Sequence, residues 1–144
     1  MKRFEFTLQK VLDFKNQTLD LLMTELGDMR HRLMKIEEKI DQLERYFTKL
    51  GAELREKYAE GVSVSEVASI RIFQDSLNGQ IRTLLKKKLD LLRLIALKQQ
   101  QILEAKSSVS GLEKLKDKQL AEYNRKVLKS EEAFVDELVS HAAV

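Results

Sequence analysis

The chain has 144 residues, of which 34% are charged and 6% aromatic, with no proline, no cysteine and a formal net charge of +3. The lack of cysteine excludes a disulfide framework and a thiolate metal site, and the few aromatic residues argue against a thick globular core. An average composition would give about seven prolines, so their absence indicates backbone without ring-enforced breaks. The composition therefore predicts an all-α chain of long helices.

A heptad repeat runs through the first predicted helix from Leu8 to Leu54. One seam position is apolar at every repeat: Leu12, Leu19, Leu26, Leu33, Ile40, Phe47 and Leu54. The other seam position holds Leu8, Lys15, Leu22, Met29, Ile36, Leu43 and Leu50. A stripe of two residues in seven is typical of a coiled coil and is narrower than the face of a globular core helix. We therefore expect a helix over about residues 4–59 that packs against another long helix.

One clear break follows this helix. Gly61 suits the left-handed position after a helix C-terminus, and Ser63 with Glu66 has the spacing of a capping box. These signals predict a turn at about 60–64 and a second helix over about residues 65–138. The stretch 107–111, Ser-Ser-Val-Ser-Gly, is the weakest part of that helix and is a candidate for a kink or a local fray.

The seam resumes after the turn. Its members are Ile70, Leu77, Ile81, Leu84, Leu91, Ile95, Ile102, Val109 and Leu112, with Gln74, Lys88, Lys98 and Ala105 as weaker ones. A pivot near Val62 places residue i opposite about 124 minus i, so residues after about 120 have no partner within the chain. The predicted fold is a single domain, 1–144, in which an antiparallel coiled-coil hairpin has a second helix that extends past the first. The same seam also fits a swapped or an extended parallel dimer, so the oligomeric state stays open.

The positive charge is concentrated in the second helix. The bases concerned are Arg82, Lys86, Lys87, Lys88, Arg93 and Lys98. They form either a solvated face whose lysine stems cover the seam, or a contact surface for phosphates or an acidic protein. Aromatic residues do not alternate with them as in proteins that bind single-stranded nucleic acid. We therefore predict no nucleic-acid partner.

Catalytic and membrane-spanning patterns are missing from the sequence. His31 falls on an outer heptad position, His141 lies near the C-terminus, and adjacent acids such as Glu131 and Glu132 point about 100° apart on a helix. There is no glycine-rich phosphate loop. The most apolar window, 89–97, is too short to span a bilayer. The sequence predicts a cytoplasmic protein that is not an enzyme and has no cofactor and no metal.

Apolar residues outside the seam are the candidates for recognition. Tyr46 and Phe73 lie near the closed end of the hairpin, where they form a docking patch or simply widen the core. At the open end the same question applies to Phe4, Phe6, Phe134, Val135 and Leu138. The apolar trace there continues through Tyr123 and Val127.

Three groups of residues carry a family resemblance. They are Phe4-x-Phe6-x-Leu8-x-x-Val11-Leu12, then Leu112-Glu113-Lys114-Leu115-Lys116-x-Lys118-Gln119-x-x-Glu122-Tyr123, and the acid pairs Glu131-Glu132 and Asp136-Glu137. In this order, and at this chain length, they resemble the flagellar export protein family FliJ. The resemblance covers essentially the whole chain and implies an antiparallel coiled coil similar to the central stalk of rotary ATPases.

The resemblance also implies a function and partners. It implies a component of flagellar type III export that associates with the export ATPase hexamer, contacts the export gate protein FlhA and handles export chaperones, at the inner face of the cell membrane. The family's gate contacts fall on Lys39, Leu43, Tyr46, Leu50, Phe73, Leu77, Gln80 and Leu84; Lys39, Gln80 and Leu84 depart from the family type. We expect the ATPase ring to contact the open end through Phe4, Phe6, Tyr123, Val127, Phe134 and Leu138. The alternative is a free-standing coiled-coil chaperone or scaffold.

Overall fold

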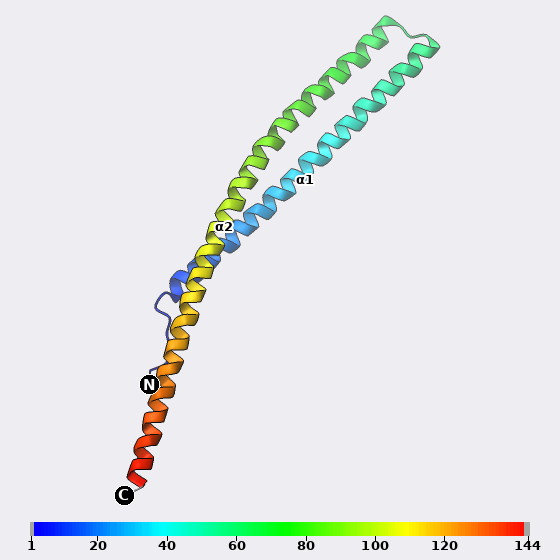
Figure 1. Ribbon diagram of the computed structural model, residues 1–144. Helices are drawn as coiled ribbons and strands as arrows, with labels where there is room; N and C mark the ends of the chain where they lie inside the picture. The colour runs from blue at the N-terminus through cyan, green and yellow to red at the C-terminus, as the bar shows by residue number, and fades with distance from the viewer. Residues whose placement is uncertain (1, 143–144) are drawn as a thin grey trace. The chain divides into compact units, whose positions relative to one another are not determined.

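A computed structural model describes residues 2–142 of the chain. Two helices account for most of them: α1, Gln9–Glu60, and the longer α2, Val64–Ala142 (Figure 1). The described residues contain no strand. The predicted all-α hairpin with a longer second helix is confirmed. By their contacts the residues fall into two compact units, Met1–Leu22 with Gln101–Val144, and Met23–Gln100, which we describe in turn.

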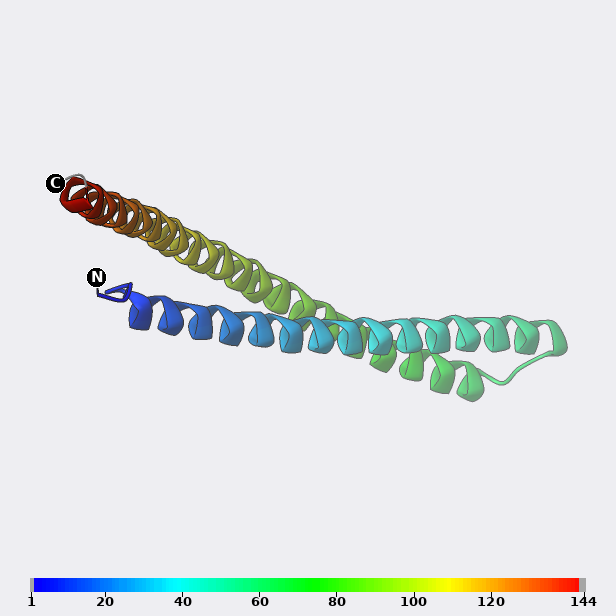
Figure 2. The same ribbon diagram turned by 90° about the horizontal axis from the view of Figure 1, so that it is seen from below.

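The connection between α1 and α2 has the predicted caps. Gly61 adopts a φ of 89°, in the left-handed region where a side chain would be strained. The Ser63 Oγ accepts a hydrogen bond of 3.2 Å from the backbone N–H of Glu66, which is the bond of an N-cap residue to the third helical position. Figure 2 shows α1 ending and the chain returning as α2 across this connection.

The unit 23–100 is held together by seam residues of both helices. Leu43, Leu50 and Leu77 form a buried cluster. Phe47, Ile70, Ile81 and Leu84 pack against it. Every seam residue predicted between residues 23 and 100 is buried or half-buried. A repeat of seven therefore keeps one stripe facing the partner helix within this unit.

Polar contacts across this unit fix its register. The Lys98 Nζ lies 2.6 Å from the Glu25 Oε2, and the Lys88 Nζ lies 3.5 Å from the Glu37 Oε1. The side-chain amide of Gln74 lies beside Gly51. The numbers of these paired residues add up to 123, 125 and 125. The predicted value of about 124 is therefore confirmed.

The other unit combines the start of α1 with the C-terminal half of α2, and in it α1 starts later than predicted. It begins at Gln9 rather than near residue 4, and the seam residue Leu8 is consequently exposed. Phe6 is only 7% exposed, in a cluster with Leu12 and Val109, and Phe4 packs against that cluster. Extended backbone places the side chains of residues 4 and 6 on one face. On a helix they would be related by a rotation of about 200° about the axis and would face nearly opposite sides. The two phenylalanines bury together only because this segment is not helical.

The structure decides one point that the sequence leaves open in this unit and corrects one expectation. α2 runs without interruption through residues 107–111, because Val109 is buried and tertiary packing outweighs a weak local helix propensity. A partner also exists beyond residue 120. The Tyr123 hydroxyl donates a 2.6 Å hydrogen bond to the Lys2 carbonyl, and its ring lies 5.6 Å from that of Phe4. The extended N-terminal segment reaches further along α2 than a helix of the same residues would.

Candidate interaction surfaces

The first candidate surface lies on one flank of the hairpin in the unit 23–100. Tyr46 precedes the seam residue Phe47 on α1, and Phe73 precedes the seam residue Gln74 on α2. Their ring centroids lie 5.6 Å apart at an interplanar angle of 63°, the edge-to-face geometry that aromatic pairs prefer. Both side chains remain exposed. The two helices thus present one aromatic pair to solvent.

A groove continues this flank away from the turn. It has a volume of about 450 Å³ and is lined by Lys39, Leu43, Ser76, Gly79, Gln80, Thr83 and Leu84. A Cβ placed on Gly79 would find no other atom within 4 Å, so the missing side chain helps to keep the groove open. We call the groove and the aromatic pair together the hairpin-end flank.

The structure places six of the eight predicted gate-contact residues on this flank, and the other two, Leu50 and Leu77, are buried. Lys39, Leu43, Gln80 and Leu84 line the groove, and Tyr46 and Phe73 form the ring pair. Leu43, Leu50 and Leu77 belong to the buried cluster between the two helices. Lys39, Tyr46, Phe73 and Gln80 are exposed and accessible to another protein.

Sequence reasoning missed three lining residues of the groove, Ser76, Gly79 and Thr83. The available signal was their size and spacing. Small residues three and four positions apart share one face of a helix, and together they lower its surface.

The basic stretch of α2 is partly committed to the fold. Lys98 is a seam residue whose side chain is 17% exposed and pairs with Glu25, and Lys88 pairs with Glu37. Arg93 lies 3.9 Å from Asp90 on its own helix, with both side chains highly exposed. Arg82, Lys86 and Lys87 are exposed. Some of these bases therefore neutralise acids of α1, and the role of the others as a contact surface stays a prediction.

The second candidate surface is the C-terminal end of α2. Every described residue from Leu128 to Ala142 is exposed, including Phe134 and Leu138, and we call this segment the tail. Val127, just before it, is half-buried. Phe4, Phe6 and Tyr123, in the same unit, pack against other side chains instead. The residues predicted to contact the ATPase therefore divide into an exposed tail and a packed group.

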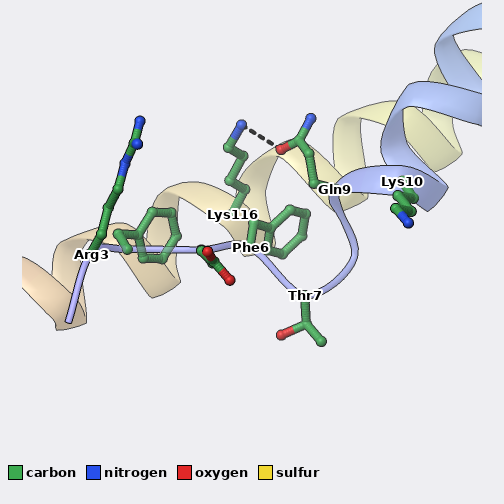
Figure 3. Close-up of a pocket in the computed structure, with 8 residues that line it drawn as sticks. Arg3, Phe6, Thr7, Gln9, Lys10 and Lys116 are labelled. Atoms are coloured by element: carbon green, nitrogen blue, oxygen red, sulfur yellow. Dashed lines mark hydrogen bonds between the residues drawn. The ribbon is translucent and has the colours of Figure 1, made fainter.

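The extended N-terminal segment forms a pocket against α2 (Figure 3). Its volume is about 770 Å³, and its lining residues are Arg3, Phe4, Glu5, Phe6, Thr7, Gln9, Lys10 and Lys116. The Lys116 Nζ donates a 2.7 Å hydrogen bond to the Gln9 Oε1, which ties α2 to the start of α1. No pattern in the sequence predicts this pocket, since it depends on the non-helical path of residues 2–8.

The described residues show no sign of a metal site or of a membrane span. They contain no group of three or more histidine and acidic side chains that could hold a metal ion. None of the helices in this part of the chain combines the length and the apolar character needed to cross a membrane.

The comparison with protein families decides the identity of this coiled coil. The family model described as "Flagellar FliJ protein" matches residues 4–144, nearly the whole chain. The chain belongs to the flagellar FliJ family. It is accordingly a coiled-coil protein of flagellar type III export. Comparisons of this FliJ-family chain with curated proteins and with solved structures found no match.

Proposed function

We propose that this chain is a non-enzymatic, stalk-like partner of the flagellar export ATPase. In this proposal the tail enters the ATPase ring, and the hairpin-end flank contacts the export gate protein FlhA. The chain also handles export chaperones. It works in the cytoplasm, peripherally associated with the inner face of the cell membrane at the flagellar base.

The exposed tail is the observation that carries the ATPase part of the proposal. Phe134 and Leu138 share one face of α2, and both are exposed, as is every described residue from Leu128 onward. A helix in water gains most of its stability by burying such a face, so this segment needs a partner protein to be stable as a helix. The inner surface of a hexameric ring offers a helix that partner from several sides.

The gate part of the proposal is supported by the hairpin-end flank. Exposed aromatic residues beside a groove are the usual anchors of protein interfaces, and truncating such anchors often costs about 2 kcal/mol of binding free energy or more. Tyr46 and Phe73 have this arrangement, and Gly79 leaves room next to them. Six of the eight residues carried over from the family lie on the same flank.

A truncated chain that ends at Val127 tests the ATPase part. It keeps the contacts of Tyr123 with Lys2 and Phe4 and removes only exposed residues of the structure. We expect it to keep its helical circular dichroism and its binding to the gate protein, while it loses binding and stimulation of the export ATPase. Full stimulation by the truncated chain would show that the tail is not the insertion point.

The double variant Tyr46→Ala/Phe73→Ala is the matched control. We expect it to stimulate the ATPase normally and to bind the gate protein at least about 30-fold more weakly. A chain that suppresses aggregation of client proteins, and neither binds nor stimulates the ATPase, would instead be a free-standing chaperone or scaffold.

A further inference from the structure

A row of leucines on α2 lies outside the seam. Leu85, Leu89 and Leu92 follow one another at spacings of four and three residues, which places them on one face of the helix. All three are exposed, although the neighbouring seam residues Leu84 and Leu91 face α1. We call these three residues the leucine row.

Bases border the leucine row on its solvent side. Arg82 and Lys86 each lie three positions before a leucine of the row, and Arg93 lies four positions after Leu89, so all three are its helical neighbours. They are exposed, and the contact of Arg93 with Asp90, at 3.9 Å between exposed side chains, is of a weak kind. An apolar row with a basic border fits an amphipathic helix that carries acids beside its apolar residues.

The tail of α2 is a helix of that kind. Its apolar residues Phe134 and Leu138 are accompanied by acids. The acids are Glu131, Glu132, Asp136 and Glu137. These acids are attracted to a basic surface on another helix.

We infer that the tail of one copy of the chain docks on the leucine row of a second copy. The two surfaces belong to the same helix, and a helical side chain reaches only residues three or four positions away on its own helix, so the partner must be another chain. Two tails paired with each other would set acids against acids, since Lys129 is the only lysine or arginine from Leu128 onward. The leucine row supplies the bases that the tail lacks.

Reciprocal charge reversal in the full-length chain tests this contact. One variant reverses the border of the row, with Arg82→Glu, Lys86→Glu and Arg93→Glu. The other reverses the tail, with Glu131→Lys, Glu132→Lys and Asp136→Lys. In each variant both surfaces carry the same sign, whereas in an equimolar mixture each tail again meets a row of opposite sign.

Sedimentation velocity over roughly a hundredfold range of protein concentration measures the association. We expect the wild-type chain to self-associate, each variant alone to do so at least about tenfold more weakly, and the mixture to recover association. A control with Lys49→Glu, Arg55→Glu and Arg71→Glu, three exposed bases away from the row, should associate like the wild type. Higher salt should weaken the wild-type association.

Several results would overturn the inference. They are a wild-type chain that stays monomeric over the whole range, a mixture that stays monomeric while both variants keep wild-type helicity, or a row-reversed variant that associates unchanged. The contact needs only this chain, so its outcome is independent of whether the export ATPase binds the tail.

Discussion

Replacement of Phe6 by alanine tests the most consequential difference between the expected and the observed fold. Phe6 was expected to contact the ATPase ring from a helix that starts near residue 4. In the structure it is 7% exposed and packs with Leu12 and Val109 in a non-helical segment. The structure therefore makes it a core residue of its unit.

The expected cost follows from burial. A phenylalanine buries about 150–250 Å² of surface, and replacing a core phenylalanine by alanine costs about 3–5 kcal/mol. The N-terminal segment can detach once its anchor is gone, so the loss cannot exceed the free energy that holds the segment in place. We therefore expect Phe6→Ala to cost about 2–4 kcal/mol in the local opening free energy.

Amide hydrogen exchange measures this opening directly. The Gln9 N–H donates a 3.0 Å hydrogen bond to the Phe6 carbonyl, so its exchange reports whether the segment is docked. Phe6→Ala should accelerate exchange at Gln9, whereas Phe14→Ala, at a residue that is 67% exposed, should leave it nearly unchanged. Equal protection in both variants, with ATPase binding lost only in Phe6→Ala, would refute the core assignment and restore a contact role.

Three further predictions concern single residues. Lys98→Met should leave the free energy of unfolding in urea unchanged within about 1 kcal/mol or raise it, because methionine continues the apolar seam and the Glu25 side chain, which is 41% exposed, stays in water without its partner; a loss above about 3 kcal/mol would mean that Glu25 is left as an unpaired buried charge. Gly27→Ala should raise the midpoint of thermal unfolding and gain up to about 1 kcal/mol, because its Cβ would meet no other atom within 4 Å. Gly61→Ala should lower the midpoint and cost about 1–2 kcal/mol, because φ is 89° there, and an unchanged midpoint would mean that the turn relaxes.

Part of the candidate surface followed from sequence alone. The sequence singles out Tyr46 and Phe73 because both are aromatic and lie outside the seam near the closed end of the hairpin. The register of about 124 sets Phe73 opposite Gly51 rather than Tyr46, so the contact between the two rings appears only in the structure. The groove beside them was not foreseeable. Its depth depends on small side chains at Ser76, Gly79 and Thr83, whose effect appears only when a second helix supplies the opposite wall.

The sequence by itself determined the two helices, their seam, their register and the turn. These properties are local or strictly periodic, since a repeat of seven, a left-handed glycine and an N-cap serine act through the nearest turns of helix. Only the tertiary structure decided the path of residues 2–8 and the continuity of α2 at Val109. Both depend on contacts between residues that are distant in sequence. Burying Phe6 and Val109 in a shared core stabilises the fold by more free energy than the local helix propensity of either segment contributes or costs.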